Sequence, residues 1–151
     1  MGRLTKLSFS SLFVLFGLIF IGGYVSSSGV GLSCPNWPLC PNGLVPSSQF
    51  IIEYIHRSVA ATSGLLVLLT MIFTLRSKEA PRPMKLTSII AGCAVVGQIS
   101  LGGVVIVKSL QPILVTGHLG LGLVLFSMSL MTALYAHQLE RRKKEVVATG
   151  V

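Results

Sequence analysis

The sequence predicts an all-α membrane protein, a bundle of four transmembrane helices made of two pseudo-symmetric helical hairpins. Hydrophobic residues make up 52% of the 151 residues and charged residues only 11%, and the mean hydropathy is +0.81. The charged residues separate four apolar runs, each close to the roughly 20 residues that a helix needs to cross a bilayer. The first and third of these runs each end near a Gly-Gly pair. We expect residues 1–151 to form a single domain.

The four expected spans follow one another with polar segments between them. They cover about residues 7–25, 50–75, 86–107 and 113–137. A long loop, residues 26–49, separates the first two. The first run follows a short basic start with Arg3 and Lys6, so a cleaved signal peptide is an alternative interpretation of that run. We favour a span because the run is long for the apolar part of a signal peptide.

The basic residues predict how the chain crosses the membrane. The formal net charge of +8 would suggest nucleic-acid binding in a soluble protein, but no basic stripe interleaved with exposed aromatic residues is present, and we expect no such partner. Ten of the twelve Lys and Arg lie in the N-terminus, the segment 76–85 and the tail 138–145. Because basic flanks concentrate in the cytoplasm, both termini are expected there, with the loop 26–49 on the outer face of the cell membrane.

The loop 26–49 carries Cys34 and Cys40 among prolines and an Asn-Gly pair, which exclude a regular helix. Two cysteines so close together predict a disulfide if the loop faces an oxidising compartment. Free thiols or half of a metal site are the alternatives, but neither a CxxC motif nor a nearby histidine supports zinc.

A cluster of ionisable residues opens the second span, in the segment Glu53-Tyr54-Ile55-His56-Arg57. On a helix, His56 and Arg57 share a face with Glu53 because they follow it by three and four positions. The chain contains no Asp, and its three other Glu lie in polar flanks. Such a cluster at the edge of a membrane span is costly and indicates a functional site.

An internal repeat relates the two hairpins. Gly22-Gly23 ends the first span and Gly102-Gly103 ends the third, and the next span in each hairpin carries a histidine about six residues inside, His56 or His118. A single histidine there is most often an interfacial residue or a bond between helices. Two histidines at matched depth on different helices favour a shared role, and such a pair is a typical ligand set for heme iron.

The neighbouring residues predict more than electron transfer. A heme protein that only carries electrons needs two ligands and no acid beside them, so Glu53 indicates a catalytic pocket in which it moves protons or stabilises a cationic intermediate. Arg57 is expected to pair with Glu53 or with a heme propionate, the alternative being that it only reaches the interface. Gln98 is expected to line the pocket or to bond a neighbouring helix. Cys93 is expected to be a buried thiol without a role.

These residues resemble the heme A synthase family in its short four-helix form. The resemblance rests on the segments Gly31–Cys40, Glu53–Arg57, Gln98–Gly103 and Thr116–His118. It covers most of the chain, from the first span to the last. The longer members look like two fused four-helix bundles, so this chain is similar to one half.

The resemblance implies an oxidoreductase that oxidises the C8 methyl group of heme O to the formyl group of heme A by successive hydroxylation, for terminal oxidase biogenesis. It implies His56 and His118 as ligands of the heme iron, Glu53 as the catalytic acid, and Cys34 with Cys40 as an outer disulfide. Heme O is then the substrate, heme A the product, and heme b the electron-transfer cofactor that longer members hold in their second bundle.

The expected partners follow from the same resemblance and from the missing half. They are the lipid bilayer, heme O synthase, an unidentified electron donor and, because one bundle is missing, further copies of this chain in a homo-oligomer.

Three other functions stay open from the residues alone. A bis-histidine membrane cytochrome b that acts only in electron transfer would leave Glu53 without purpose. A disulfide-forming quinone oxidoreductase is also a four-helix protein, but it needs an exchange-active pair, commonly CxxC, which Cys34 and Cys40 do not form. A non-enzymatic assembly or binding subunit would carry no heme.

Overall fold

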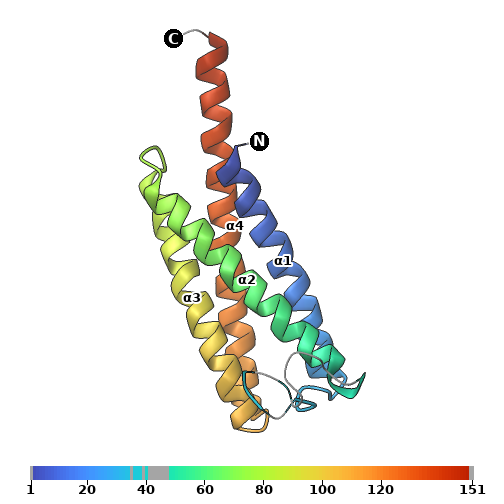
Figure 1. Cartoon of the computed structure of the whole chain (residues 1–151). Helices are drawn as coiled ribbons and strands as arrows, with labels where there is room; N and C mark the ends of the chain where they lie inside the picture. Colours follow the sequence, from blue (N-terminus) through green and yellow to red (C-terminus); the bar gives the residue numbers. More distant parts are fainter. Residues whose placement is uncertain (1, 35, 39, 41–47, 150–151) are drawn as a thin grey trace.

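The computed structural model describes residues 2–34, 36–38, 40 and 48–149. In this part of the chain four long helices follow one another, and a short 3-10 helix, η1 (Ser48–Phe50), precedes the second. The helices are α1 (Arg3–Ser27), α2 (Ile51–Arg76), α3 (Arg82–Val107) and α4 (Pro112–Thr149) (Figure 1). All four are long and apolar enough to cross a membrane. The predicted four-helix, all-α membrane fold is confirmed.

The helices are neighbours around the bundle in chain order, because α1 packs on α2 and α4, and α3 packs on the same two helices. The disulfide loop after α1 and the α3–α4 turn lie at one end of the bundle, which we call the loop end (Figure 1). The N-terminus and the α2–α3 connection lie at the other, the terminal end. With this arrangement α2 and α4, which carry the two histidines, occupy opposite corners.

The fourth helix is longer than the sequence predicts. We expect the span to end near residue 137, with a polar tail after it, but α4 continues to Thr149. No glycine or proline interrupts residues 123–149, so nothing in this segment breaks a helix. Ion pairs one turn apart, Glu140 with Lys144 and Arg141 with Glu145, also favour the helical form.

The repeat extends along whole helices. Inward positions of α1 recur in α3, each 80 residues further along, as from Leu15 to Val95. The four pairs nearest the loop end are Leu15 and Val95, Leu18 and Gln98, Gly22 and Gly102, and Val25 and Val105. Inward positions of α2 recur in α4 62 residues further along, as from His56 to His118. The two hairpins are therefore related by pseudo-symmetry over their length.

The middle of the bundle is apolar, whereas the terminal half contains buried hydroxyl groups. The apolar cluster comprises Leu15, Val67, Ala91, Ala94, Val95 and Leu125. Towards the terminal end, four hydroxyls related by the repeat line a cavity of about 10 Å³: Ser8, Thr70, Ser88 and Thr132. Each donates a hydrogen bond to a carbonyl of its own helix, which accommodates a hydroxyl in an apolar interior. This layer of hydroxyl groups was not predicted from the sequence.

The outward faces of the helices are apolar, as expected for helices surrounded by lipid. Large hydrophobic residues are exposed on all four helices, among them Phe13, Leu65, Val96 and Leu123. Cys93, which we expect to be buried, is exposed on this surface. The prediction was wrong because an apolar helix in a membrane has no clear hydrophobic contrast between its core face and its lipid face.

Candidate active site at the loop end of the bundle

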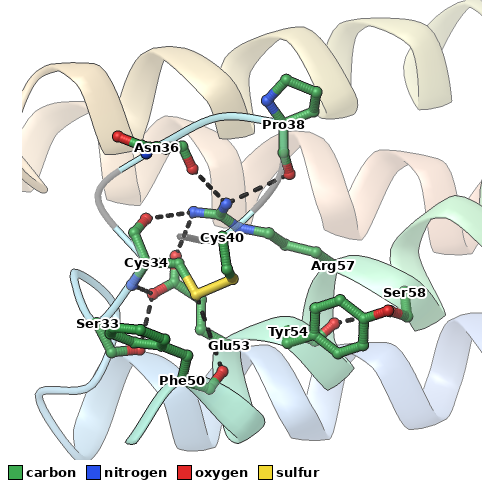
Figure 2. Close-up of a disulfide and its surroundings, with 10 residues drawn as sticks. All are labelled: Ser33, Cys34, Asn36, Pro38, Cys40, Phe50, Glu53, Tyr54, Arg57 and Ser58. Carbon is green, nitrogen blue, oxygen red and sulfur yellow. Dashed lines mark hydrogen bonds and ion pairs between the residues drawn. A yellow bond between two sulfur atoms is a disulfide. The ribbon is translucent and has the colours of Figure 1, made fainter. Parts of the chain in front are cut away.

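Glu53 is a fully buried carboxylate in the first turn of α2. Its side chain is 2% exposed, and its position near the helix N-terminus favours a negative charge. Its Oε2 accepts hydrogen bonds from the backbone N–H of Cys34 at 2.7 Å and from the Ser33 hydroxyl at 3.0 Å. Its Oε1 accepts one from Arg57 at 2.6 Å (Figure 2). Both oxygens of the acid are therefore engaged.

Arg57 lies one helical turn from Glu53 and reaches across to the loop. Its Nη2 donates to Glu53 and to the carbonyl of Cys34 at 2.7 Å. Its Nη1 donates to the carbonyls of Asn36 at 2.5 Å and Pro38 at 3.3 Å (Figure 2). The predicted ion pair with Glu53 is formed. Because each terminal nitrogen already has two acceptors, a further anion at either of them would have to displace one of these partners.

The loop is closed by a disulfide between Cys34 and Cys40, with an S–S distance of 1.99 Å. Both cysteines are buried. The predicted disulfide is thus present, and no group of three His, Cys, Asp or Glu that would hold a metal ion occurs among the described residues. The ring that the disulfide closes presents its backbone carbonyls to Arg57 (Figure 2).

The loop also contacts the second hairpin. The indole of Trp37 packs so closely on Gly103 of α3 that a Cβ there would lie 3.0 Å from it. The side chain of Leu110, in the α3–α4 turn, packs against Gly31. The loop therefore bridges α2, α3 and the turn. At Gly23, the counterpart of Gly103, no described atom lies within 4 Å of a Cβ position.

The two histidines occupy equivalent positions in the two hairpins. The His56 ring lies against Gly22 of α1, where a Cβ would come within 3.1 Å of Cε1 and 3.7 Å of Nδ1. The His118 ring lies in the same way against Gly102 of α3, with distances of 3.3 Å and 3.9 Å. The first glycine of each Gly-Gly pair therefore makes room for a histidine.

This arrangement fits the chemistry of a bound heme. The Nδ1 atoms of His56 and His118 are buried and have no hydrogen-bond partner within the described part of the chain, and an unpaired buried polar atom is costly. In each ring Cε1 and Nδ1 are the atoms nearest the glycine, and Nε2 lies more than 4 Å from the Cβ position. Imidazoles from two helices of a bundle are an established ligand set for heme iron.

Two further polar residues belong to this end of the bundle. Gln98 on α3 donates from Nε2 to the carbonyl of His118 at 3.0 Å, which confirms the predicted bond to a neighbouring helix. Ser33, which holds Glu53, was not predicted. Its position beside Cys34 carries no signal, because the contact depends on how the loop folds back over α2.

Comparison with known proteins assigns the family. The family model described as Cytochrome oxidase assembly protein, COX15-CtaA, matches residues 45–150. The chain belongs to the COX15-CtaA family. The matched part contains Glu53, His56, Arg57 and His118, whereas Cys34 and Cys40 precede it.

Several relatives in the COX15-CtaA family carry the name Heme A synthase. The chain is 31% identical over 136 residues to that of Bacillus licheniformis, which is 88% of this chain and 44% of the relative. It is 29% identical over 150 residues to that of Exiguobacterium sibiricum, or 94% and 50%. To a Bacillus cereus protein it is 33% identical over 132 residues, or 84% and 41%. The chain spans about half the length of the curated relatives it matches.

The contacts of Glu53 predict that it stabilises the disulfide loop. Glu53→Gln leaves the Arg57 guanidinium without its counter-charge, and removing one partner of a buried pair is strongly destabilising. Because both cysteines are buried, reduction requires the loop to open. We expect dithiothreitol to reduce the disulfide about tenfold faster in this variant. Maleimide labelling and mass spectrometry, in a Cys93→Ser background, measure the rate.

The matched control is Glu145→Gln, which removes an exposed partner of Arg141 and should leave the rate unchanged. Equal rates in the Glu53 variant and the parent would show that the ion pair does not hold the loop.

Proposed function

We propose that this chain has the heme A synthase activity named in its relatives, which is the oxidation of the C8 methyl group of heme O to the formyl group of heme A by successive hydroxylation. The observation that carries the proposal is the pair of imidazoles set against equivalent glycines, with a buried carboxylate one turn away on α2. The similarity to proteins named Heme A synthase supports it. Heme O is the proposed substrate and heme A the product.

In this proposal His56 and His118 hold the heme iron through their imidazole nitrogens. The bound heme supplies the redox chemistry of its iron. A heme b that passes electrons would need a second site, which a further copy of this chain in a homo-oligomer would provide. Heme O synthase and an electron donor are the other proposed partners.

Glu53 is the proposed catalytic acid. Its Oε2 already accepts two hydrogen bonds and its Oε1 accepts one from Arg57, so both oxygens are occupied by donors. A proton delivered to Oε1 would compete with the guanidinium for that oxygen. Proton transfer at Glu53 is therefore coupled to the position of Arg57, which in turn is held by the loop. Arg57 would bind a heme propionate through its Nε–H, or through a terminal nitrogen that exchanges a loop carbonyl for it.

The orientation that we propose places both termini in the cytoplasm and the disulfide loop on the outer face of the cell membrane, with residues 1–151 as one domain. The charge distribution supports it, and so does the disulfide, which is typical of an oxidising compartment.

The heme composition of the purified protein tests the activity. In cells that supply heme O, we expect heme A in the wild type and heme O or its hydroxylated derivative in Glu53→Gln, with product lowered at least about a hundredfold for a lost acid catalyst. Reduced-minus-oxidised spectra and chromatography of extracted hemes measure this. His56→Ala and His118→Ala should each lower bound heme. If the wild type and Glu53→Gln both contained only heme b, the protein would instead be a cytochrome.

The glycines test the histidine pair. Gly22→Val and Gly102→Val would push a side chain into His56 or His118, and we expect about tenfold less bound heme in each, as overpacking costs about 1–3 kcal/mol. Gly23→Val is the matched control, because a Cβ there meets no described atom within 4 Å. A control variant that loses as much heme would contradict the assignment. Absorbance of the heme per mole of protein is the measurement.

Accessibility in intact cells tests the orientation. In a background without Cys93, we expect a cysteine at Lys108 in the α3–α4 turn to react with a membrane-impermeant maleimide, and one at Ser77 in the α2–α3 connection to react only after lysis. The reverse pattern would overturn the proposed topology.

A further inference from the structure

Pseudo-symmetry makes one polar side chain in the core stand out. Gln98 is half-buried on α3, three residues after Val95 and four before Gly102, and its side chain reaches α4. Its counterpart in the first hairpin is Leu18, which packs against the apolar cluster. The structure thus places a carboxamide at one of two otherwise equivalent positions beside the histidines.

The carboxamide is tightly positioned on the interface of α3 and α4. Its Nε2 donates to the His118 carbonyl at 3.0 Å and lies 3.1 Å from where a Cβ of Gly122 would be. The His118 ring rests on Gly102, one turn along α3 from Gln98. The imidazole and the carboxamide therefore both meet α3 near its loop end, at positions four residues apart, or about 6 Å along the helix axis.

The oxygen of this carboxamide is an unused acceptor. Because a carbonyl only accepts, the group that faces the His118 carbonyl must be the NH₂ group, and Oε1 points elsewhere. Oε1 is buried and has no hydrogen-bond partner among the residues that the structure describes. A buried acceptor without a donor is costly, and the site is thus complementary to a ligand that brings an O–H or N–H group.

We propose that Gln98 Oε1 accepts a hydrogen bond from an alcohol hydroxyl on the periphery of the bound heme, and so selects hydroxyl-bearing hemes over heme b. The inference rests on the proposed function. Heme O carries one such hydroxyl on the alkyl chain that replaces a vinyl group of heme b, and the first hydroxylation of its methyl group adds another. Both are alcohols, whereas heme b has no hydroxyl and its propionates are acceptors when ionised.

Binding titrations of the heme-free protein test this without turnover. Heme b, heme O and the hydroxymethyl derivative of heme O are titrated into the full-length protein in detergent. In Gln98→Leu, which copies the Leu18 position, we expect heme O or its derivative to bind about five- to tenfold more weakly and heme b to bind as before. If heme O itself binds more weakly to the variant, Gln98 recognises the hydroxyl on the alkyl chain of heme O. If only the hydroxymethyl derivative binds more weakly, Gln98 recognises the hydroxyl that the first hydroxylation adds.

Two further variants separate recognition from packing. Gln98→Glu keeps one donor and one acceptor when it is protonated. Below the pKa of the introduced acid it should restore the preference for hydroxyl-bearing hemes over heme b. Leu18→Ala disturbs the equivalent position of the other hairpin and should weaken all three hemes alike.

The outcomes distinguish this inference from the proposed function. Equal weakening of all three hemes in Gln98→Leu, or no weakening of any, would overturn the role of Gln98 while leaving the heme site intact. A wild-type protein that binds none of the hemes through His56 and His118 would overturn the proposed function, and the role of Gln98 with it.

Discussion

The ion pair between Glu53 and Arg57 is the interaction on which the loop end depends. A carboxylate that is 2% exposed is very costly unless it is paired and hydrogen-bonded. Here the guanidinium neutralises it, and two donors from the loop complete its oxygens. The same guanidinium also holds the loop in place, because three of its four hydrogen bonds are donated to backbone carbonyls of the loop. The start of α2, the disulfide loop and the acid therefore form one unit.

This coupling has a consequence for the proposed chemistry. A catalytic acid usually has one oxygen free to exchange protons, whereas both oxygens of Glu53 accept hydrogen bonds from neighbouring groups. Under the proposed function, a change in the protonation of Glu53 is also a change in what holds the loop and Arg57. The disulfide, which fixes the loop carbonyls, then acts on the same site through Arg57.

The two histidines are related by the internal repeat, whereas the polar residues around them are not. His56 and His118, with Gly22 and Gly102 beneath them, are related by the repeat and form a symmetric pair. The polar groups around them are not symmetric, because the counterparts of Glu53, Arg57 and Gln98 are Val115, Leu119 and Leu18. Under the proposed function, a symmetric histidine pair would suit the centre of a macrocycle, whose four nitrogens are nearly equivalent. An asymmetric polar shell suits its periphery, where the substituents differ.

The comparison between sequence and structure separates local from long-range information. The four helices, the pairing of Cys34 with Cys40, and the matched depth of His56 and His118 were all predictable. Each depends on the length of an apolar run, on spacing along the chain or on a repeat, all of which can be read in one dimension. The proposed roles of Glu53, His56, Arg57 and His118 in heme binding and catalysis stay predictions.

The sequence by itself determined that the chain is a four-helix membrane protein with two equivalent histidines and an acid beside one of them. Only the tertiary structure decided that Glu53 is bound by Ser33 and the Cys34 backbone, that Arg57 donates to three loop carbonyls, and that Cys93 faces outward. The physical reason is that core and lipid are both apolar, so hydropathy does not distinguish the inner face of a helix. Hydrogen bonds from a loop, moreover, depend on the path of its backbone rather than on its composition.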